Sequence, residues 1–117
     1  SDAADLMRFA FVERIDYPAE LLVPKKMTAA EAREALRAAR DVLAGLEPFD
    51  APAIEGALRE LADRLEIKVG QLLGPVRVAI SGSTVSLPLF ESLDALGRER
   101  TLRRLDAALE KLAGVDD

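Results

Sequence analysis

The apolar residues of this chain recur at the three- and four-residue spacing of an α-helix, in segments that proline and glycine separate. They do not alternate with polar residues, as they would along a half-buried strand. Aromatic residues make up only 4% of the sequence, β-branched residues are sparse, and alanine, leucine, glutamate and arginine, which favour helices, are abundant. The pattern therefore predicts an all-α, multihelical fold with about six helices.

Start and stop signals locate these helices along the chain. Thr28 and Glu31 have the spacing of a capping box, and Asp50 is a residue type that caps helix N-termini. Ser86 is expected to cap a further helix that has Pro88 in its first turn. We expect helices at about 2–13, 28–44, 50–66, 69–82, 86–97 and 98–113, with a short helical turn between Pro18 and Pro24.

Length and composition fit one domain. The chain has 117 residues, of which 50% are apolar and 32% are charged. This is enough apolar material for one core, and it is the balance of a soluble globular protein. We therefore expect residues 1–117 to form a single domain. The segment 1–13 is short and strongly apolar, so we expect it to end a preceding helical region or to pack against one.

The composition also excludes several kinds of chemistry. The sequence contains no histidine and no cysteine, which removes disulfides, thiolate nucleophiles, Ser-His dyads, zinc fingers and nearly all transition-metal sites. The longest apolar runs are a few residues, against about 20 for a membrane span, and the acidic start lacks the features of a secretory signal. We therefore expect a cytoplasmic chain without membrane contact. The net charge of −5 argues against nonspecific phosphate neutralisation, but it leaves a local basic face open.

One ordered string of residues carries a family resemblance. It reads GPVRVAISGSTVSLPLFE over 74–91 and LGRERTLRRL over 96–105. This string resembles the pattern PLRVALTG-x-x-SPPLFE…LG-x-ER-x-x-x-RL in the C-terminal segment of bacterial glutamyl-tRNA synthetases. Residues 7–11, residues 21–26 and the helix that starts at Thr28 also resemble that family. The resemblance therefore covers essentially the whole chain.

The resemblance implies an activity and partners. Enzymes of this family are class I synthetases, in which a nucleotide-binding catalytic domain precedes all-helical domains that grip the tRNA anticodon arm. Neither the HIGH-like nor the KMSKS-like signature occurs here, because histidine is absent and Lys25-Lys26-Met27 lacks the Ser-Lys-Ser continuation. We therefore expect a non-catalytic piece, without its own cofactor or metal, that recognises the tRNA(Glu) anticodon arm. It would belong to a monomeric polypeptide whose upstream helical and catalytic domains ligate glutamate to tRNA with ATP and Mg²⁺.

Arg77 is the first candidate contact to RNA. It lies on the polar side of the predicted helix 69–82, where a guanidinium can fork onto a base edge or phosphate and stack on an unpaired base. The alternative is a solvated arginine or a surface ion pair. The resemblance matches Arg77 to an anticodon-contacting arginine, and Ser86, Leu87 and Leu89 to residues that touch the second and third anticodon letters. The alternative for Ser86 and Leu89 is a structural role, as a helix cap and a core residue.

Leu87 departs from the family pattern, which usually has proline at this position. The exchange restores a backbone N–H donor and offers an apolar side chain at the junction between loop and helix. Free N–H groups at a helix start can bind phosphate or base acceptors.

Charge is distributed unevenly along the chain. Residues 68–105 carry six basic and three acidic side chains, a net charge of +3, which leaves −8 for the remainder. A basic pole of this kind can orient a domain on tRNA. The candidates for tRNA backbone contacts are Lys25, Lys26, Arg98 and Arg100. The lysines can instead be plainly solvated, and the alternative for the four arginines of 98–104 is a set of helix-surface ion pairs with Glu99, Asp106 and Glu110.

Two other functions stay open at this level. The acidic balance also fits a free-standing helical protein-interaction module that derives from a synthetase tail and has lost its RNA role. The third function is a small enzyme that uses carboxylates such as Asp63 and Glu66. A solvated helix face explains those two residues better.

Overall fold

The described part of the chain consists of helices and short connections. The computed structural model describes residues 17–24, 26–82 and 88–114, and within these ranges it contains no strand. Its elements are the 3₁₀-helix η1 (Ala19–Leu22) and the α-helices α2 (Ala29–Ala44), α3 (Ala51–Leu65), α4 (Val69–Ser81), α5 (Leu89–Leu96) and α6 (Arg98–Ala113). The all-α prediction is confirmed, as are five of the six expected helices. The expected helix at 2–13 lies outside the described residues.

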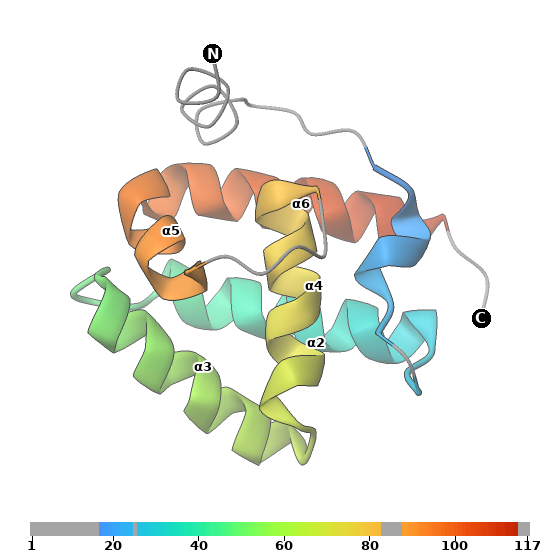
Figure 1. The fold of residues 1–117 in the computed structure, drawn as a ribbon, viewed down its shortest axis with the longest axis horizontal. Coiled ribbons are helices and arrows are strands. Elements are labelled where there is room, and N and C mark those ends of the chain that lie inside the picture. Colours follow the sequence, from blue (N-terminus) through green and yellow to red (C-terminus); the bar gives the residue numbers. More distant parts are fainter. Residues whose placement is uncertain (1–16, 25, 83–87, 115–117) are drawn as a thin grey trace.

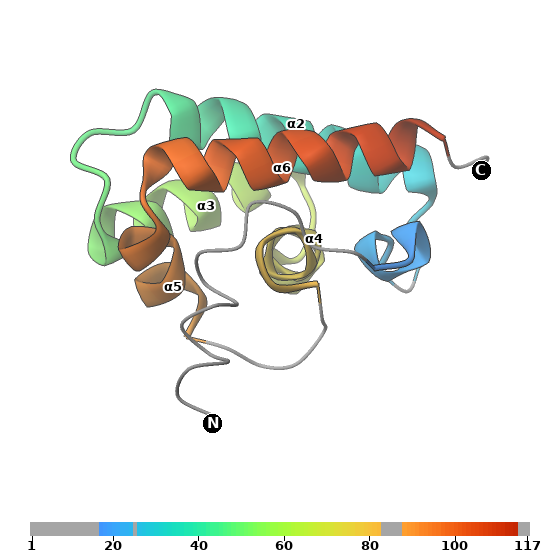
Figure 2. The same cartoon turned by 90° about the horizontal axis from the view of Figure 1, so that it is seen from above.

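Helix α4 lies at the centre of the arrangement. Figure 1 shows α2 and α6 running lengthwise, with α4 crossing in front of them. Figure 2, seen from above, shows α2 and α6 side by side and α4 almost end-on beneath them. Helix α4 contacts α2, α3, α6 and η1, and α5 contacts α3 and α6. The long apolar face of α4 is therefore covered from several sides.

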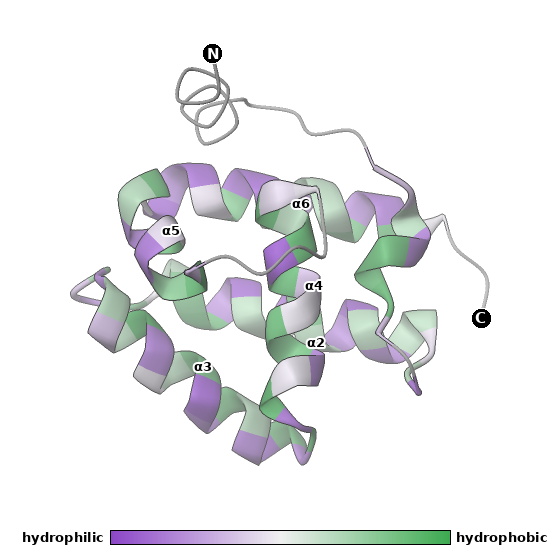
Figure 3. Cartoon of the chain, viewed as in Figure 1, coloured by the Kyte–Doolittle hydropathy of each residue, from purple (hydrophilic) through white to green (hydrophobic). Residues whose placement is uncertain are grey.

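Leucine-rich stripes from every helix meet in one core. Figure 3 shows apolar and polar segments mixed along α2, α3 and α6, as expected for helices with one face in water. Within the described residues, no helix is long and apolar enough to span a membrane. The largest fully buried side chains include Leu36, Leu43, Ile54, Leu58, Leu72, Val76, Leu93, Leu105 and Leu112.

Local capping signals act as the sequence predicts at the starts of α2 and α3. The Thr28 hydroxyl accepts the Glu31 backbone N–H at 3.1 Å, and the Glu31 carboxylate accepts the Thr28 N–H at 2.9 Å, which completes the capping box. Asp50 accepts the Ala53 N–H at 3.0 Å. A second carboxylate, which local sequence does not predict, serves the same helix end: Asp94 of α5 accepts the Ala51 N–H at 3.1 Å. This contact ties α5 to the start of α3.

Helix α5 begins later than expected. Its first residue is Leu89 and its N-cap is Pro88, whose ψ of 85° is not helical. The Pro88 carbonyl accepts the first helical hydrogen bond, from the Ser92 N–H at 2.9 Å. The prediction of Pro88 within the first turn, after a cap at Ser86, is therefore wrong, and Ser86 itself lies outside the described residues. Gly97 ends α5 with φ 90° and ψ 158°, a conformation that essentially only glycine adopts.

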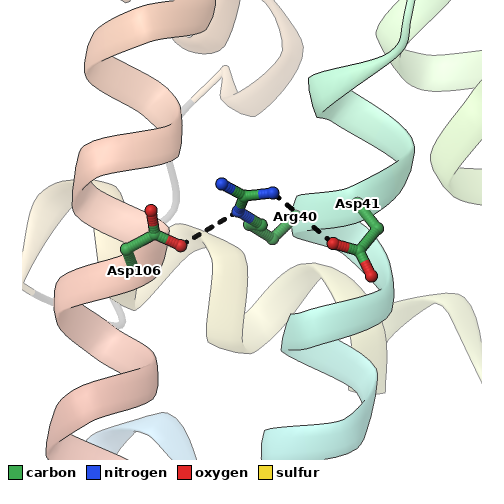
Figure 4. Close-up of polar contacts among 3 residues, drawn as sticks. All are labelled: Arg40, Asp41 and Asp106. Carbon is green, nitrogen blue, oxygen red and sulfur yellow. Dashed lines mark hydrogen bonds and ion pairs between the residues drawn. The ribbon is translucent and has the colours of Figure 1, made fainter.

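Polar contacts join α2 to α6 along their length. Arg40 Nε binds Asp106 at 3.0 Å, and its Nη1 lies 3.5 Å from Asp41 (Figure 4). The hydrogen bond that Arg40 donates to Asp106, together with the negative charge of Asp106, raises the pKa of Arg40 above its ordinary value. Where the start of α2 lies beside the end of α6, Arg33 donates to the Leu112 carbonyl at 3.0 Å. Asp106 thus pairs with Arg40 of α2, a partner that the sequence did not suggest.

Tyr17, which lies just before η1, is held against the end of α6 by Lys111. Lys111 Nζ donates to the Tyr17 carbonyl at 3.1 Å and lies 4.7 Å from the centre of the Tyr17 ring. Burial of this ring raises the pKa of the Tyr17 hydroxyl to about 12. These contacts join Tyr17 to the last turn of α6.

Helix α3 ends in a Schellman motif that has glutamate in the position usually taken by glycine. The Ile67 N–H donates to the Ala62 carbonyl and the Glu66 N–H to the Asp63 carbonyl, both at 3.1 Å. Glu66 has φ 58° and ψ 40°, in the left-handed region. This conformation costs a side chain with a Cβ atom roughly 1–2 kcal/mol.

We expect Glu66→Gly to stabilise the protein by about 0.5–1 kcal/mol, because glycine removes the left-handed penalty at an exposed position and loses part of that gain to chain entropy. Glu60→Gly is the matched control, because Glu60 is equally exposed but lies inside α3. The control should lose about 0.5–1 kcal/mol. Urea unfolding measures both changes, and a loss of stability in Glu66→Gly would contradict the role given to the Schellman motif.

The Tyr17 hydroxyl should titrate near pH 12 in the folded protein and near its ordinary pKa of 10.0 in denaturant. Tyr17 is the single tyrosine and tryptophan is absent, so ultraviolet absorbance follows this group alone. Because the folded-state pKa is raised, its contribution to stability is complete below pH 10 and is lost as the pH rises towards 12. Equal midpoints in the folded and unfolded chain would show that the ring is not buried.

Candidate nucleic-acid interface

The C-terminal turn of α4 carries the first candidate, Arg77. Gly82 closes this turn in the left-handed conformation, with φ 71°, and its N–H donates to the Val78 carbonyl at 2.6 Å. Ser81 is buried, and its hydroxyl donates to the Arg77 carbonyl at 2.6 Å. The turn that presents Arg77 is therefore well defined by local bonds, and the glycine predicted to end the helix does so.

Arg77 is half-buried and lines a groove of about 260 Å³ between η1 and α4. Its Nε atom is buried and has no hydrogen-bond partner within the part of the chain that the structure describes. Leu21, at 38% exposure, is the large apolar side chain that stands out into solvent at this groove. The other residues that line it are Glu20, Val23, Pro24, Gly74 and Val78.

This groove combines an arginine that has donor capacity to spare with apolar walls. A guanidinium in such a setting can donate to a base edge or a phosphate, and its plane can stack on an unpaired base. Glu20 at the same groove adds a hydrogen-bond acceptor and a negative charge. Arg77 is thus half-buried at a mostly apolar groove and not on a solvated polar face, and among the described residues its Nε atom has no partner.

The other anticodon candidates contribute less to the described surface. Leu89 is 3% exposed and belongs to the core, so its side chain is closed to a ligand. Ser86, Leu87 and Lys25 lie outside the described residues. Lys26 is exposed, has a left-handed backbone with φ 69°, and lines a separate groove of about 310 Å³ with residues of α2, α3 and α4.

Arg98 is engaged inside the protein. Its Nη2 donates to the Leu46 carbonyl, and its guanidinium carbon lies 5.4 Å from the centre of the Phe49 ring. These contacts fix the connection between α2 and α3, so a phosphate would have to compete with them. Arg100 is half-buried and also interacts within the chain.

The basic pole is smaller than the charge count predicts, because Arg104 is not a surface residue. Arg104 is 4% exposed, and its Nη1 donates to the Ile80 carbonyl at 2.6 Å. The ion pair expected on the helix surface forms at its neighbour, Arg103, which lies 3.6 Å from Glu99. A signal for Arg104 exists in the sequence: it shares the buried stripe of α6 with Thr101, Leu105, Ala108 and Leu112.

The described residues offer no group of three or more acidic side chains that could hold a metal ion. The carboxylates Asp63 and Glu66 are both exposed on the last turn and end of α3. Glu66 takes part in the helix end through its backbone.

Comparison with known proteins identifies the family. A family model described as an anticodon binding domain matches residues 1–109. The chain is 50% identical over 114 residues to the glutamate–tRNA ligase of Roseiflexus castenholzii. The matched region is 97% of this chain and 22% of that relative. It is 45% identical over 115 residues to the glutamate–tRNA ligase of Mycolicibacterium vanbaalenii, which covers 97% of this chain and 23% of that relative.

A solved structure has the same fold. The crystal structure of a glutamate tRNA ligase from Elizabethkingia meningosepticum, in complex with its amino acid, matches with a TM-score of 0.81 and 21% identity, over 95% of this chain and 22% of that one. The chain thus spans less than a quarter of the length of the relatives that it matches. Because the family model matches residues 1–109, the chain belongs to the anticodon binding domain family.

Proposed function

We propose that this chain reads unpaired bases in the anticodon arm of tRNA(Glu), with Arg77 as its principal base contact. The observation that carries the proposal is the half-buried side chain of Arg77, which lines an apolar groove and whose buried Nε atom has no partner in the described residues. A buried donor without a partner costs about 1–3 kcal/mol. A ligand with acceptors on a flat ring, such as a nucleobase, can accept from the accessible part of this half-buried guanidinium and stack on its plane.

The recognition of single-stranded RNA supports this assignment. Loop bases are splayed from the stack and are bound by hydrogen bonds to their edges and by stacking on planar side chains. Phe, Tyr and Trp together make up 4% of the chain, so the guanidinium of Arg77 is the stacking surface that this groove supplies. The apolar side chains of Leu21 and Val78 line the same groove and exclude water from the contact.

The remaining candidates take lesser parts in the proposal. Leu89 acts through the start of α5, because its side chain is in the core. Lys26 and Arg100 contact the tRNA backbone, whereas Arg98 serves the fold. Ser86, Leu87 and Lys25 keep the roles that the resemblance implies.

The function of the longer polypeptide is part of the same proposal. Residues 1–117 act as one domain of a monomeric, cytoplasmic glutamate–tRNA ligase, whose catalytic domain uses ATP and Mg²⁺. This domain then supplies tRNA selection and no chemical step. No observation favours the alternative of a free-standing protein-interaction module.

We expect Arg77→Ala to weaken binding of a glutamate tRNA anticodon stem-loop by roughly 10-fold or more, because one base contact and its stacking surface are lost. Titration of the 117-residue chain, followed by NMR at low salt, measures the affinity. Arg64→Ala is the control, since Arg64 is exposed on α3 and carries the same charge. Thermal unfolding of Arg77→Ala should stay close to wild type, because no hydrogen bond of its side chain is broken.

A loop with swapped anticodon bases distinguishes base reading from phosphate binding. The wild-type chain should bind it more weakly, and Arg77→Ala should bind both loops alike. Equal affinity of the wild-type chain for the two loops, or an unchanged affinity in Arg77→Ala, would refute base reading through Arg77.

Lys26→Ala should weaken binding of both loops by the same factor, because a phosphate contact carries no sequence information. The slope of log affinity against log salt should fall by roughly 0.7, the value for one phosphate on a single strand. The same salt titration on the Arg77→Ala variant is the comparison. A loss confined to the native loop would show that Lys26 contacts a base instead.

A further inference from the structure

One charged residue lies in the buried stripe of α6. Arg104 is 4% exposed and packs in register with Leu105 and Ala108. Its Nη1 donates to the Ile80 carbonyl, 24 residues earlier in the chain, at 2.6 Å. Arg104 also makes a further interaction within the chain. The side chain therefore spans from α6 to the C-terminal end of α4.

The bond has a physical reason at the α4 end. The last four carbonyls of a helix have no partner within it, and the Ile80 carbonyl is one of these in α4. Arg104 satisfies that acceptor, and its positive charge lies at the negative end of the helix dipole. An apolar side chain would fill the stripe without removing a guanidinium from water. What an apolar residue cannot do is bind the carbonyl.

The turn that Arg104 holds is the turn that presents Arg77. The hydroxyl of Ser81, the residue after Ile80, donates to the Arg77 carbonyl at 2.6 Å. Both views of the fold show the end of α4 lying against α6 (Figure 1, Figure 2). Successive residues of a helix are rotated by roughly 100°, so fraying or rewinding of this turn redirects the Arg77 side chain.

We propose that Arg104 is a positioning residue for anticodon binding: through the Ile80 carbonyl it fixes the last turn of α4 and with it the guanidinium of Arg77. Arg104 itself, being buried, does not touch RNA. The inference rests on the proposed function of Arg77. It predicts that removing the Arg104 donor lowers RNA affinity even in a chain that stays folded.

A double-mutant cycle tests this assignment. Arg104→Met keeps the apolar stem and removes the donor, and it is compared with Arg77→Ala and with the double variant. Affinity for the anticodon stem-loop is measured well below the unfolding midpoint of each variant, where circular dichroism reports a folded chain. Arg104→Met should lose roughly five- to tenfold in affinity in the wild-type background. It should lose less than about twofold in the Arg77→Ala background, because two residues that act through one contact are not additive.

Arg103→Met is the matched control. It removes the same charge from the adjacent position of α6, where the side chain is exposed and pairs with Glu99. Its affinity should stay within about twofold of wild type, since an exposed ion pair within α6 contributes little. A loss equal to that of Arg104→Met would mean that net charge, and not position, sets the affinity, and would overturn the proposal.

A second variant covers the case in which Arg104→Met does not fold. Arg104→Lys keeps a charged donor with a shorter reach, and the same cycle applies to it with a smaller expected loss. In the free chain, the NMR signal of the Arg77 Nε–H should shift in Arg104→Lys and stay unchanged in Arg103→Met. An unmoved Arg77 signal would overturn the proposal without any RNA present.

The outcomes separate this inference from the function on which it rests. If Arg104→Met binds the loop with wild-type affinity while Arg77→Ala binds it weakly, the positioning role of Arg104 fails and the proposed base contact of Arg77 stands. If the two losses add in the double variant, Arg104 acts independently of Arg77 and the proposal fails as well. If the wild-type chain does not discriminate between the native and swapped loops, the proposed function itself fails.

Discussion

Burial of α4 is the constraint on which the rest of this structure depends. Eight of its thirteen residues are buried, including Pro75 in the middle of the helix. Proline in a helix interior removes a donor and costs about 3 kcal/mol. Helix α4 tolerates this proline because its packing against neighbouring elements offsets the cost. Those elements are α2, α3, α6 and η1. Each surrounding helix is in turn oriented by the face that it presents to α4.

The last carbonyls of a helix have no partner within that helix. Cationic side chains from neighbouring elements donate to such carbonyls at or near the ends of α4, α6 and α2. Arg104 donates to the Ile80 carbonyl at the end of α4, and Arg33 donates to the Leu112 carbonyl in the last turn of α6. Arg98 donates to the Leu46 carbonyl just beyond α2. In each case a positive side chain meets carbonyls at the negative end of a helix. With Lys111, which donates to the Tyr17 carbonyl, four of the sixteen basic side chains of this acidic protein are seen to bind its own backbone.

Local signals predict the elements, and long-range pairing decides what the charged residues do. The capping box at Thr28 and the cap at Asp50 lie within four residues of their partners, so the sequence locates them correctly. The Asp94 contact to Ala51 and the Arg104 contact to Ile80 join residues 43 and 24 positions apart, which no local pattern encodes. For Arg104, the apolar register of α6 indicates burial but not the partner.

The same contrast explains why the candidate site was only partly predictable. Arginines at 77, 98 and 104 look alike in a charge count, yet two of them bind backbone carbonyls. The buried Nε of Arg77 has no partner in the described residues. Arg98 also has a buried Nε without a partner in the described residues. Its Nη2 is bound to the Leu46 carbonyl and its guanidinium lies over the Phe49 ring, so a ligand must compete with those contacts. Arg77 lines a groove instead, and there a ligand meets no such competition. Tertiary packing, and not the count of charges, therefore decides which of these arginines lies at a groove.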